Sequence, residues 1–290
     1  MHPHPRGYVC MRAAVPPAFD GNLEMGEWGR AAWTEDFLDI EGAVVPRLRT
    51  RAKMLWDEDC FYIAAEMEEP DLWATYTEHD SVIFQENDFE AFFDPDGDCH
   101  GYFEYEVNAL GTDWDLRLDK PYRDQGNADN SWEVEGLRKA VVLRGGVNAP
   151  ETRAEGWTVV LGFPWSAFGL DAPLPGAQWR VNFSRVEWDL EVVEGKYRKI
   201  EGRPEHNWVW SPQWAIDMHR PELWGYVQFG DAAAEFVPDP DWDDLCFAFA
   251  AYRAHREGSP IVAESQTRDG FVWFRSGRVR VREDSLTKRD

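Results

Sequence analysis

The chain has 290 residues, 43% of them hydrophobic, which is enough for one large domain or two small ones. Its formal net charge of −24 repels nucleic-acid phosphates and anionic lipid head groups, so neither nucleic acid nor a membrane surface is an expected partner. The N-terminus lacks the apolar core of a signal peptide, and no stretch approaches the ~20 apolar residues of a membrane span. We therefore expect a cytoplasmic protein from the chain as written, or a secreted or periplasmic one if the true start lies upstream.

Short strands are predicted from the start of the chain. An edge strand is expected at residues 8–13, and another short strand at 37–40. Apolar and polar side chains alternate over residues 51–56, and a buried run at 60–66 follows the acidic turn 57–59. These two segments together predict a β-hairpin.

The most informative stretch, residues 85–115, contains two strands joined by an acidic turn. The strands are predicted at 88–93 and 102–109, and the turn between them reads Asp-Pro-Asp-Gly-Asp. Side chains alternate faces along a strand, so the second strand has an apolar face and a polar one. The polar face carries Tyr102, Glu104, Glu106 and Asn108. Acids, an amide and aromatic rings on one face are what a sugar-binding sheet needs.

Further strands follow as far as residue 230. They are predicted at 132–135, 140–144, 156–163, 178–188, 207–214 and 223–229. The long strand 178–188 repeats the design of the central one. Its apolar face carries Trp179, Val181 and Phe183, and its polar face carries Arg180, Asn182, Ser184 and Trp188. Sugar-binding groups are therefore expected on two strands.

Many short strands separated by Gly and Pro predict an all-β fold, an antiparallel β-sandwich of immunoglobulin-like or jelly-roll type, over residues 1–230. Residues 231–290 differ from this pattern. Asp243 is a suitable cap for a helix that runs to about Glu257, and residues 271–281 alternate around Ser276-Gly277 as a hairpin does. We predict that this short helix and hairpin extension packs on the sandwich, because about 60 residues bury little core alone.

Nine motifs occur along the chain in an order that resembles a known family. They are DGN, TRAKMLWDEDCFYIAAE, NDFEAFFDPDGD, YFEYEVNALGTDWD, KPYRD, GWTVVLGFPWSAFG, WRVNFSRVEW, NWVWSPQ and HRPELWGYVQF. Together they are similar to the carbohydrate-binding module family 9-like proteins, a β-sandwich group related to DOMON domains. The resemblance covers roughly residues 8–230.

The resemblance implies a site on one sheet, where a sugar lies between two aromatic rings and is held by a carboxylate, an arginine and amides. It also implies that calcium often binds elsewhere on the fold. The carboxylate falls on Glu90, and the Arg-x-Asn pattern of the founding modules falls on Glu106 and Asn108, so a glutamate stands in place of the arginine. The two aromatic walls fall on Trp188 and Phe84.

We therefore predict non-catalytic binding of a saccharide, for which no cofactor is required. The candidate residues are Phe84, Glu90, Glu104, Glu106, Asn108, Trp114, Asp115, Asn182, Ser184, Arg185 and Trp188. Arg185 has the opposite parity to Asn182, so it needs a β-bulge to join that face, or it pairs with one of the acids instead.

Two other functions remain open at this stage. Glu104 and Glu106 are carboxylates on one face about 7 Å apart, a separation that inverting glycoside hydrolases use for their acid and base. This alternative predicts an enzyme that cleaves an oligo- or polysaccharide. Met54, Met218 and His219 are available as axial ligands if the protein binds haem, as some DOMON relatives do.

The acidic turn is a candidate calcium site. Asp94, Asp96 and Asp98 surround Gly97 with the alternating spacing of calcium loops, but the complete EF-hand pattern is absent. Because such a turn also forms without a metal, calcium is an optional ligand here rather than a required one.

Overall fold

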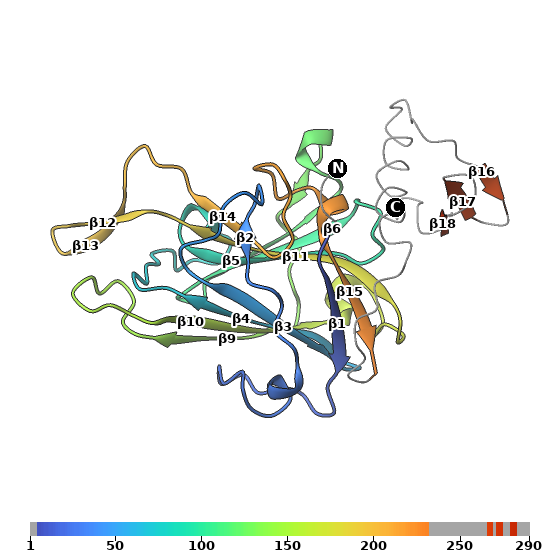
Figure 1. Cartoon of the computed structure of the whole chain (residues 1–290), viewed down its shortest axis with the longest axis horizontal. Helices are drawn as coiled ribbons and strands as arrows, with labels where there is room; N and C mark the ends of the chain where they lie inside the picture. The colour runs from blue at the N-terminus through green and yellow to red at the C-terminus, as the bar shows by residue number, and fades with distance from the viewer. Residues whose placement is uncertain (1–4, 232–265, 269–270, 275–278, 283–290) are drawn as a thin grey trace.

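The computed structural model describes residues 5–231, 266–268, 271–274 and 279–282 (Figure 1). Strands form nearly all of the regular structure, and the helical segments in this part of the chain are 3-10 turns of three or four residues. The predicted all-β fold class is therefore confirmed. No helix of the described residues has both the length and the apolar character needed to cross a membrane.

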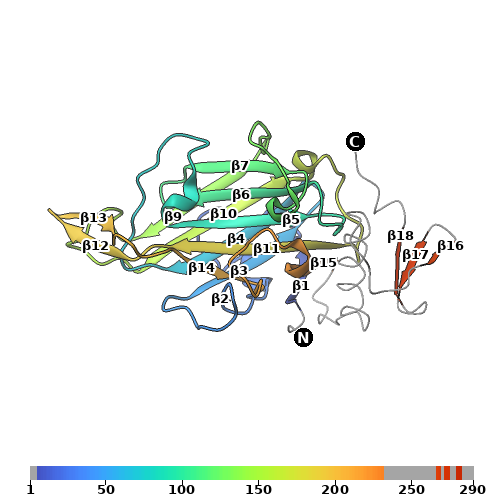
Figure 2. The ribbon, with the colours of Figure 1, turned by 90° about the horizontal axis from the view of Figure 1, so that it is seen from above.

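Two layers of strands face each other, one above the other in Figure 1. The upper layer has the order β8-β7-β6-β5-β11-β15, and β14 pairs with both β11 and β2. These strands are β2 (Leu38–Asp39), β5 (Asp88–Asp94), β6 (Tyr102–Asn108), β7 (Asp113–Leu118), β8 (Ala128–Asp129), β11 (Gln178–Glu187), β14 (His206–Val209) and β15 (Gly225–Gly230). Figure 2 shows β7, β6, β5 and β11 side by side.

The lower layer has the order β3-β4-β10-β9. Its strands are β3 (Thr50–Trp56), β4 (Cys60–Glu68), β9 (Arg138–Arg144) and β10 (Gly156–Pro164). The predicted hairpin at residues 51–66 is confirmed, since β3 and β4 pair antiparallel from Thr50↔Met67 to Trp56↔Phe61. A separate hairpin of β12 (Leu190–Val193) and β13 (Lys196–Lys199) extends beyond one end of the sandwich (Figures 1 and 2).

The first strand, β1 (Gly7–Arg12), joins the two layers. It pairs with β15 along its length, from Gly7↔Tyr226 to Met11↔Gly230, and with β3 only near its end. Both pairings are parallel, so the sheet is mixed, and the strand expected at an edge lies inside the sheet. The reason is topological. The first and last strands of the sandwich lie next to each other in the same orientation, and parallel pairing suits strands joined by a long connection.

The core follows from the alternation of side chains along each strand. In β6, Phe103, Tyr105 and Val107 are buried between the layers, whereas Glu104 and Glu106 face outwards to the other side of the sheet. This is the division of faces that the sequence predicts, because one-residue steps along a strand reverse the side-chain direction.

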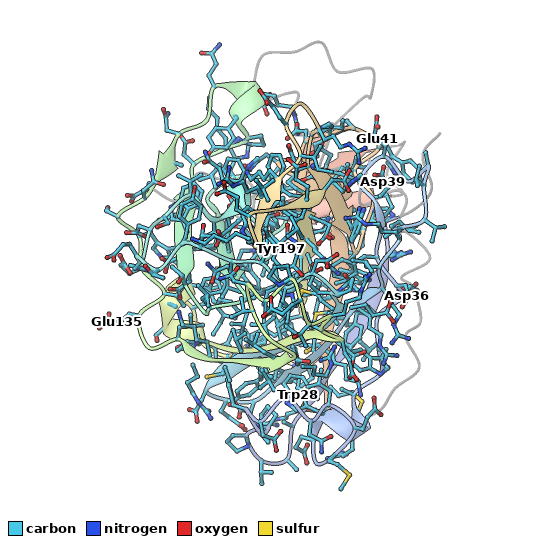
Figure 3. The ribbon with its side chains drawn as sticks, turned by 90° about the vertical axis from the view of Figure 1, so that its left-hand side faces the viewer. Trp28, Asp36, Asp39, Glu41, Glu135 and Tyr197 are labelled. Atoms are coloured by element: carbon cyan, nitrogen blue, oxygen red, sulfur yellow. The ribbon has the colours of Figure 1, made fainter. Side chains whose placement is uncertain are left out.

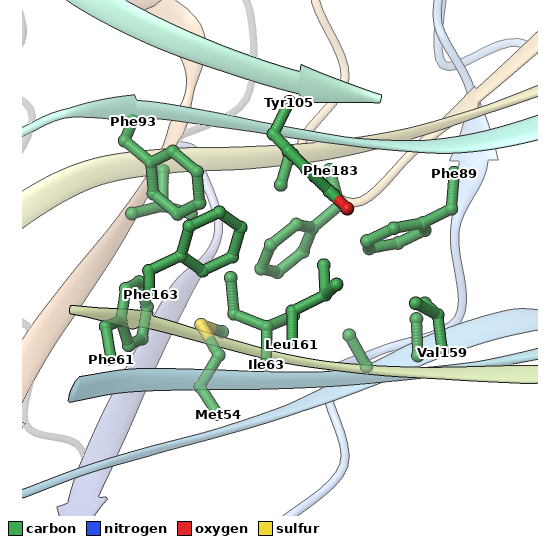
Figure 4. Close-up of a cluster of buried hydrophobic side chains, with 14 of the residues drawn as sticks. Met54, Phe61, Ile63, Phe89, Phe93, Tyr105, Val159, Leu161, Phe163 and Phe183 are labelled. Atoms are coloured by element: carbon green, nitrogen blue, oxygen red, sulfur yellow. The ribbon is translucent and has the colours of Figure 1, made fainter. Parts of the chain in front are cut away.

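Aromatic rings connect the two layers across the core (Figure 4). The ring of Phe93 on β5 lies 4.9 Å from that of Phe163 on β10 and 5.9 Å from that of Phe61 on β4, measured between centroids. Burial of each such ring stabilises the fold by roughly 1.5–3 kcal/mol. The upper layer is therefore held firmly from below, which fixes the outer face of β5 and β6.

The outer face of the lower layer is covered by the N-terminal segment. Trp28 lies beneath this layer (Figure 3), where it packs with Leu23 against Tyr62 and Val160. The ammonium group of Lys53 donates hydrogen bonds to the backbone oxygens of Leu23 and Trp28, at 2.7 and 2.9 Å. The outer face of the lower layer, where Lys53 lies, is thus covered by the loop that contains Leu23 and Trp28.

One predicted strand does not form, and a long strand beside β6 was not predicted. Residues 132–135 form no strand, because the backbone N–H of Val134 donates to the side chain of Asp115 instead of a neighbouring strand. In contrast, β7 is a strand that the sequence analysis did not predict, and it pairs antiparallel with β6 from Tyr102↔Leu118 to Val107↔Asp113.

The tail contains the predicted hairpin. β17 (Phe271–Phe274) and β18 (Val279–Arg282) pair antiparallel, and β16 (Gln266–Arg268) adds a third strand. The helix predicted at residues 243–257 lies outside the described residues. The division of the chain into 1–230 and 231–290, and the packing of the second part on the first, stay predictions.

Candidate functional site

A cavity of about 290 Å³ lies over the outer face of the upper layer. Each of three neighbouring strands contributes two side chains to its lining. They are Glu90 and Phe92 from β5, Glu104 and Glu106 from β6, and Trp114 and Leu116 from β7. Phe84, Tyr122 and residues 216–219 add walls from loops distant in sequence. The rigid strands thus supply the floor, and the loops supply the sides.

Aromatic rings form one side of the cavity. The rings of Phe84 and Trp114 are stacked, with centroids 6.3 Å apart and planes inclined by 27°. The backbone of Phe84 is fixed twice, because its N–H donates to Oε2 of Glu106 at 3.0 Å and its oxygen accepts from Nε1 of Trp188 at 3.1 Å. Tyr122 is 48% exposed in the same cavity. Flat apolar surfaces are therefore available to a ligand.

Carboxyl groups form the floor. Glu90, Glu104 and Glu106 line the cavity although each residue is at most 5% exposed. Burial raises the pKa of Glu90 to about 7. Burial, together with the charge of Glu90, raises the pKa of Glu104 and of Glu106 well above the ordinary glutamate value. The three groups therefore accept or donate hydrogen bonds according to the pH and the ligand.

No basic side chain balances these acids among the described residues that line the cavity, apart from His219. Burial lowers the pKa of His219 to about 4, so its ring is neutral near pH 7. Its Nε2 lies 4.0 Å from Oε2 of Glu104. Arg123 lies nearby but is engaged by Asp217 and Glu222, at 3.2 and 2.8 Å. The cavity lining thus contains several acidic groups and no positively charged side chain among the described residues.

The structure divides the predicted residues into two groups. Five of them line the cavity: Phe84, Glu90, Glu104, Glu106 and Trp114. The other six lie outside its lining: Asn108, Asp115, Asn182, Ser184, Arg185 and Trp188. Of these, Ser184 is the nearest in register to the floor, directly opposite Glu90 in the β5–β11 pair.

Both predicted amides are tied to the backbone. Asn108 donates to the backbone oxygen of Tyr76 and to Glu86, and accepts from the backbone of Leu110 and Thr112. Asn182 donates to the backbone oxygen of Ser211 at 2.9 Å and accepts from its N–H at 2.8 Å. An amide side chain has the same donor and acceptor as a peptide group, which suits both positions.

Asp115, Arg185 and Trp188 also have local partners. Asp115 accepts from the backbone of Val134. Arg185 is buried and pairs with Glu69 and Glu187. Of the two options considered for Arg185, the structure therefore shows the pairing with acids. The ring of Trp188 lies under the ammonium group of Lys199, at 3.5 Å from ring centroid to Nζ.

Several residues of the cavity were not identified from the sequence. Tyr122 belongs to the KPYRD motif and Asp217 to the loop before His219. Asp88 lies outside this lining but clusters with Glu90 and Glu106, and its parity with Glu90 along β5 was the available indication that it belongs to the same face.

The acidic turn is organised by its own backbone. The two oxygens of Asp94 accept from the backbone N–H groups of Gly97 and Cys99, at 3.1 and 2.9 Å. One oxygen from each of Asp94, Asp96 and Asp98 lies within 4.8 Å of the others, which fits a calcium ion in size. Calcium at this turn stays a prediction.

The haem ligands considered from the sequence do not converge. Met54 lies in the core between the layers (Figure 4), whereas Met218 and His219 line the cavity on the outer face. The site also favours binding over hydrolysis. Burial raises the pKa of both Glu104 and Glu106 well above the ordinary glutamate value, so neither is held ionised as the general base that an inverting hydrolase needs.

An all-β sandwich with a concave aromatic and acidic site on one layer has the architecture of a small-ligand binding module. The family model described as carbohydrate family 9 binding domain-like matches residues 19–191, and the chain belongs to this family. Among curated proteins, no sequence matches the chain.

Solved structures share the fold at low sequence identity. A candidate carbohydrate-binding protein from Bacteroides uniformis is 15% identical, with a TM-score of 0.58 over 78% of this chain and 99% of that one. A family 9 carbohydrate-binding module from Caldicellulosiruptor kristjanssonii is 16% identical in two structures. Its complex with cellotriose has a TM-score of 0.51 over 81% of this chain and 100% of that one. Its complex with glucose has a TM-score of 0.52 over 80% and 100%.

Proposed function

We propose that the protein binds a saccharide, without catalysis, in the cavity over β5, β6 and β7. The observation that carries this proposal is the stacked pair Phe84 and Trp114 beside the carboxyl groups of Glu90, Glu104 and Glu106. Sugars have C–H faces that pack on aromatic rings, and hydroxyl groups that hydrogen-bond to carboxyl oxygens. One concave site here offers both surfaces.

Family membership supports the same function, as do the complexes of the Caldicellulosiruptor kristjanssonii module with cellotriose and with glucose. The cavity volume of about 290 Å³ is near the lower end of small-ligand sites, which begins at roughly 300 Å³. A mono- or disaccharide unit therefore fits the cavity better than a long chain.

Isothermal titration calorimetry across a panel of neutral saccharides tests this function with Trp114→Ala. The substitution removes one stacking ring, and we expect at least a tenfold loss of affinity, about 1.4 kcal/mol. Trp33→Ala is the matched control, because that ring is partly buried on the lower layer, 3.8 Å from the guanidinium carbon of Arg51. A wild-type protein that binds no saccharide, or two variants that bind equally well, would contradict the proposal.

A further inference from the structure

Three carboxylates meet at the base of the cavity. One oxygen from each of Asp88, Glu90 and Glu106 lies within 4.8 Å of the others. The three residues are 0%, 5% and 1% exposed. Calcium binds oxygen ligands at 2.3–2.6 Å, so two ligands of one ion lie at most about 5 Å apart. A single ion can therefore reach all three side chains.

Three oxygen atoms at this place have no hydrogen-bond partner within the described part of the chain. They are Oδ2 of Asp88, Oε2 of Glu90 and Oγ of Ser184, and all three are buried. The second oxygen of Asp88 accepts from the backbone N–H of Val186 at 3.1 Å, which fixes that carboxylate in place. Buried polar atoms without partners are rare in folded proteins, and they indicate a group that the site is built to receive.

Protein cations do not fill this role. No salt bridge between described residues joins Asp88, Glu90 or Glu106 to a lysine, an arginine or a histidine. The acidic turn at Asp94 differs in this respect, because both oxygens of Asp94 already accept backbone hydrogen bonds. The unbalanced charge and the unpartnered oxygens therefore coincide at the cavity floor.

We propose that Asp88, Glu90 and Glu106 bind a calcium ion with Ser184 Oγ as a fourth ligand, and that a saccharide in the cavity completes its coordination. The second half rests on the proposed saccharide binding. A set of oxygen ligands without nitrogen or sulfur suits calcium rather than zinc, and calcium tolerates irregular geometry that magnesium does not. Because Glu90 and Glu106 also line the cavity, the ion faces the ligand.

Calorimetric titration of EDTA-stripped protein with calcium chloride tests the ion site. We expect the titration to contain a site that is weakened at least tenfold in Glu90→Gln and in Asp88→Asn. The control is Asp96→Asn in the acidic turn, which should retain this site with its wild-type affinity. Thermal unfolding verifies that each variant is folded. If Glu90→Gln or Asp88→Asn does not fold, Glu106→Gln is used in its place. Absence of calcium binding, or its loss in Asp96→Asn with retention in Glu90→Gln, overturns the site.

Saccharide titrations with saturating calcium and with EDTA test the second half. We expect at least tenfold tighter binding with calcium, and equal affinities overturn the role of the ion in ligand binding. If calcium binds at the cluster but no saccharide binds, the ion site stands and the proposed function fails. Glucosamine tests whether the positive charge at the cluster comes from an ammonium group of the ligand instead of a calcium ion. If glucosamine binds EDTA-stripped protein more tightly than glucose does and calcium does not displace it, the cluster binds an ammonium group and the calcium proposal is wrong.

Discussion

Two groups of buried acids lie at opposite faces of β11. They differ in whether an arginine lies between the acids. Glu69 and Glu187 are 2% and 3% exposed, and the guanidinium group of Arg185 lies between them, at 2.7 and 2.8 Å. Asp88 and Glu90 are about as deeply buried, yet none of the arginines, lysines and histidines that the structure describes forms a salt bridge with them. We refer to these as the paired acids and the unpaired acids.

The difference shows what burial of an acid means for function. Charges removed from water cost several kcal/mol unless a partner compensates them. The paired acids have that partner within the chain, and Arg185 is itself held in place by a hydrogen bond that it donates to Thr50. The unpaired acids leave the cost in place until a ligand or a proton arrives. Burial without compensation is therefore a mark of a binding site.

The largest expected effect comes from removing the base of the paired acids. Arg185→Met leaves Glu69 and Glu187 buried without a cation, and we expect a loss of about 3–5 kcal/mol in the free energy of unfolding. Urea denaturation measures it. Arg47→Met is the control, because Arg47 also contacts Glu187 but is 44% exposed, so its loss should cost less than about 1 kcal/mol. Similar losses in both variants would remove the distinction between the two groups.

A somewhat smaller effect is expected from the pH dependence of the unpaired acids. Burial raises the pKa of Glu90 from 4.5 to about 7. Between these values the folded state holds more protons than the unfolded state, so the free energy of unfolding falls as the pH rises. The titratable groups that face Glu90 are Asp88, Glu104 and Glu106. Glu90→Gln removes this contribution and should stabilise the protein at pH 8, relative to pH 5, by on the order of 3 kcal/mol.

Urea unfolding of wild type and Glu90→Gln in EDTA, at pH 5 and pH 8, measures this difference. His79 is common to both proteins and cancels. Burial lowers its pKa, but the hydrogen bonds to Glu133 and Asp113 outweigh this effect and raise it to about 9. A wild-type protein that gains stability over this range relative to the variant contradicts the raised pKa of Glu90.

The smallest effect on stability is expected when the unpaired acids are given a base. Glu106→Arg places a guanidinium group beside Asp88 and Glu90, with the adjoining cavity to accommodate its length. We expect a gain of about 1 kcal/mol at pH 8 in EDTA, and loss of calcium binding. Glu106→Gln is the control, since it removes the acid without supplying a base. Equal stability of the two variants means that compensation by arginine adds nothing here.

The fold and the orientation of the site were predictable from local alternation. The alternation along β6 predicts which side of the strand faces the core. Phe103 and Tyr105 lie on that side and Glu104 and Glu106 on the other, as the structure confirms. The same reasoning correctly separates Phe183 from Ser184 on β11. Periodicity is a property of neighbouring residues, so the sequence contains it in full.

The burial of the polar face was not predictable in this way. Alternation placed Glu106 on a polar, sugar-binding face but did not predict that it is only 1% exposed. The backbone of Phe84 donates to Oε2 of Glu106, and residues 216–219 line the same cavity. Those contacts join segments far apart in the chain, and alternation contains no information about them. Asn108 and Asn182 show the same limit, because their backbone partners at Tyr76 and Ser211 lie 32 and 29 residues away.

The parallel pairing of β1 with β15 has a consequence for synthesis on the ribosome. Gly7 leaves the exit tunnel long before its partner Tyr226 has been translated, so the two layers cannot close until nearly all of the sandwich has emerged. During this interval β3 lacks one neighbour and presents an open edge to other nascent chains. Contacts between such distant segments also slow folding. Completion of the sandwich therefore depends on β15, the last of its strands to be made, and a truncation before Gly225 should yield aggregates rather than a smaller sandwich.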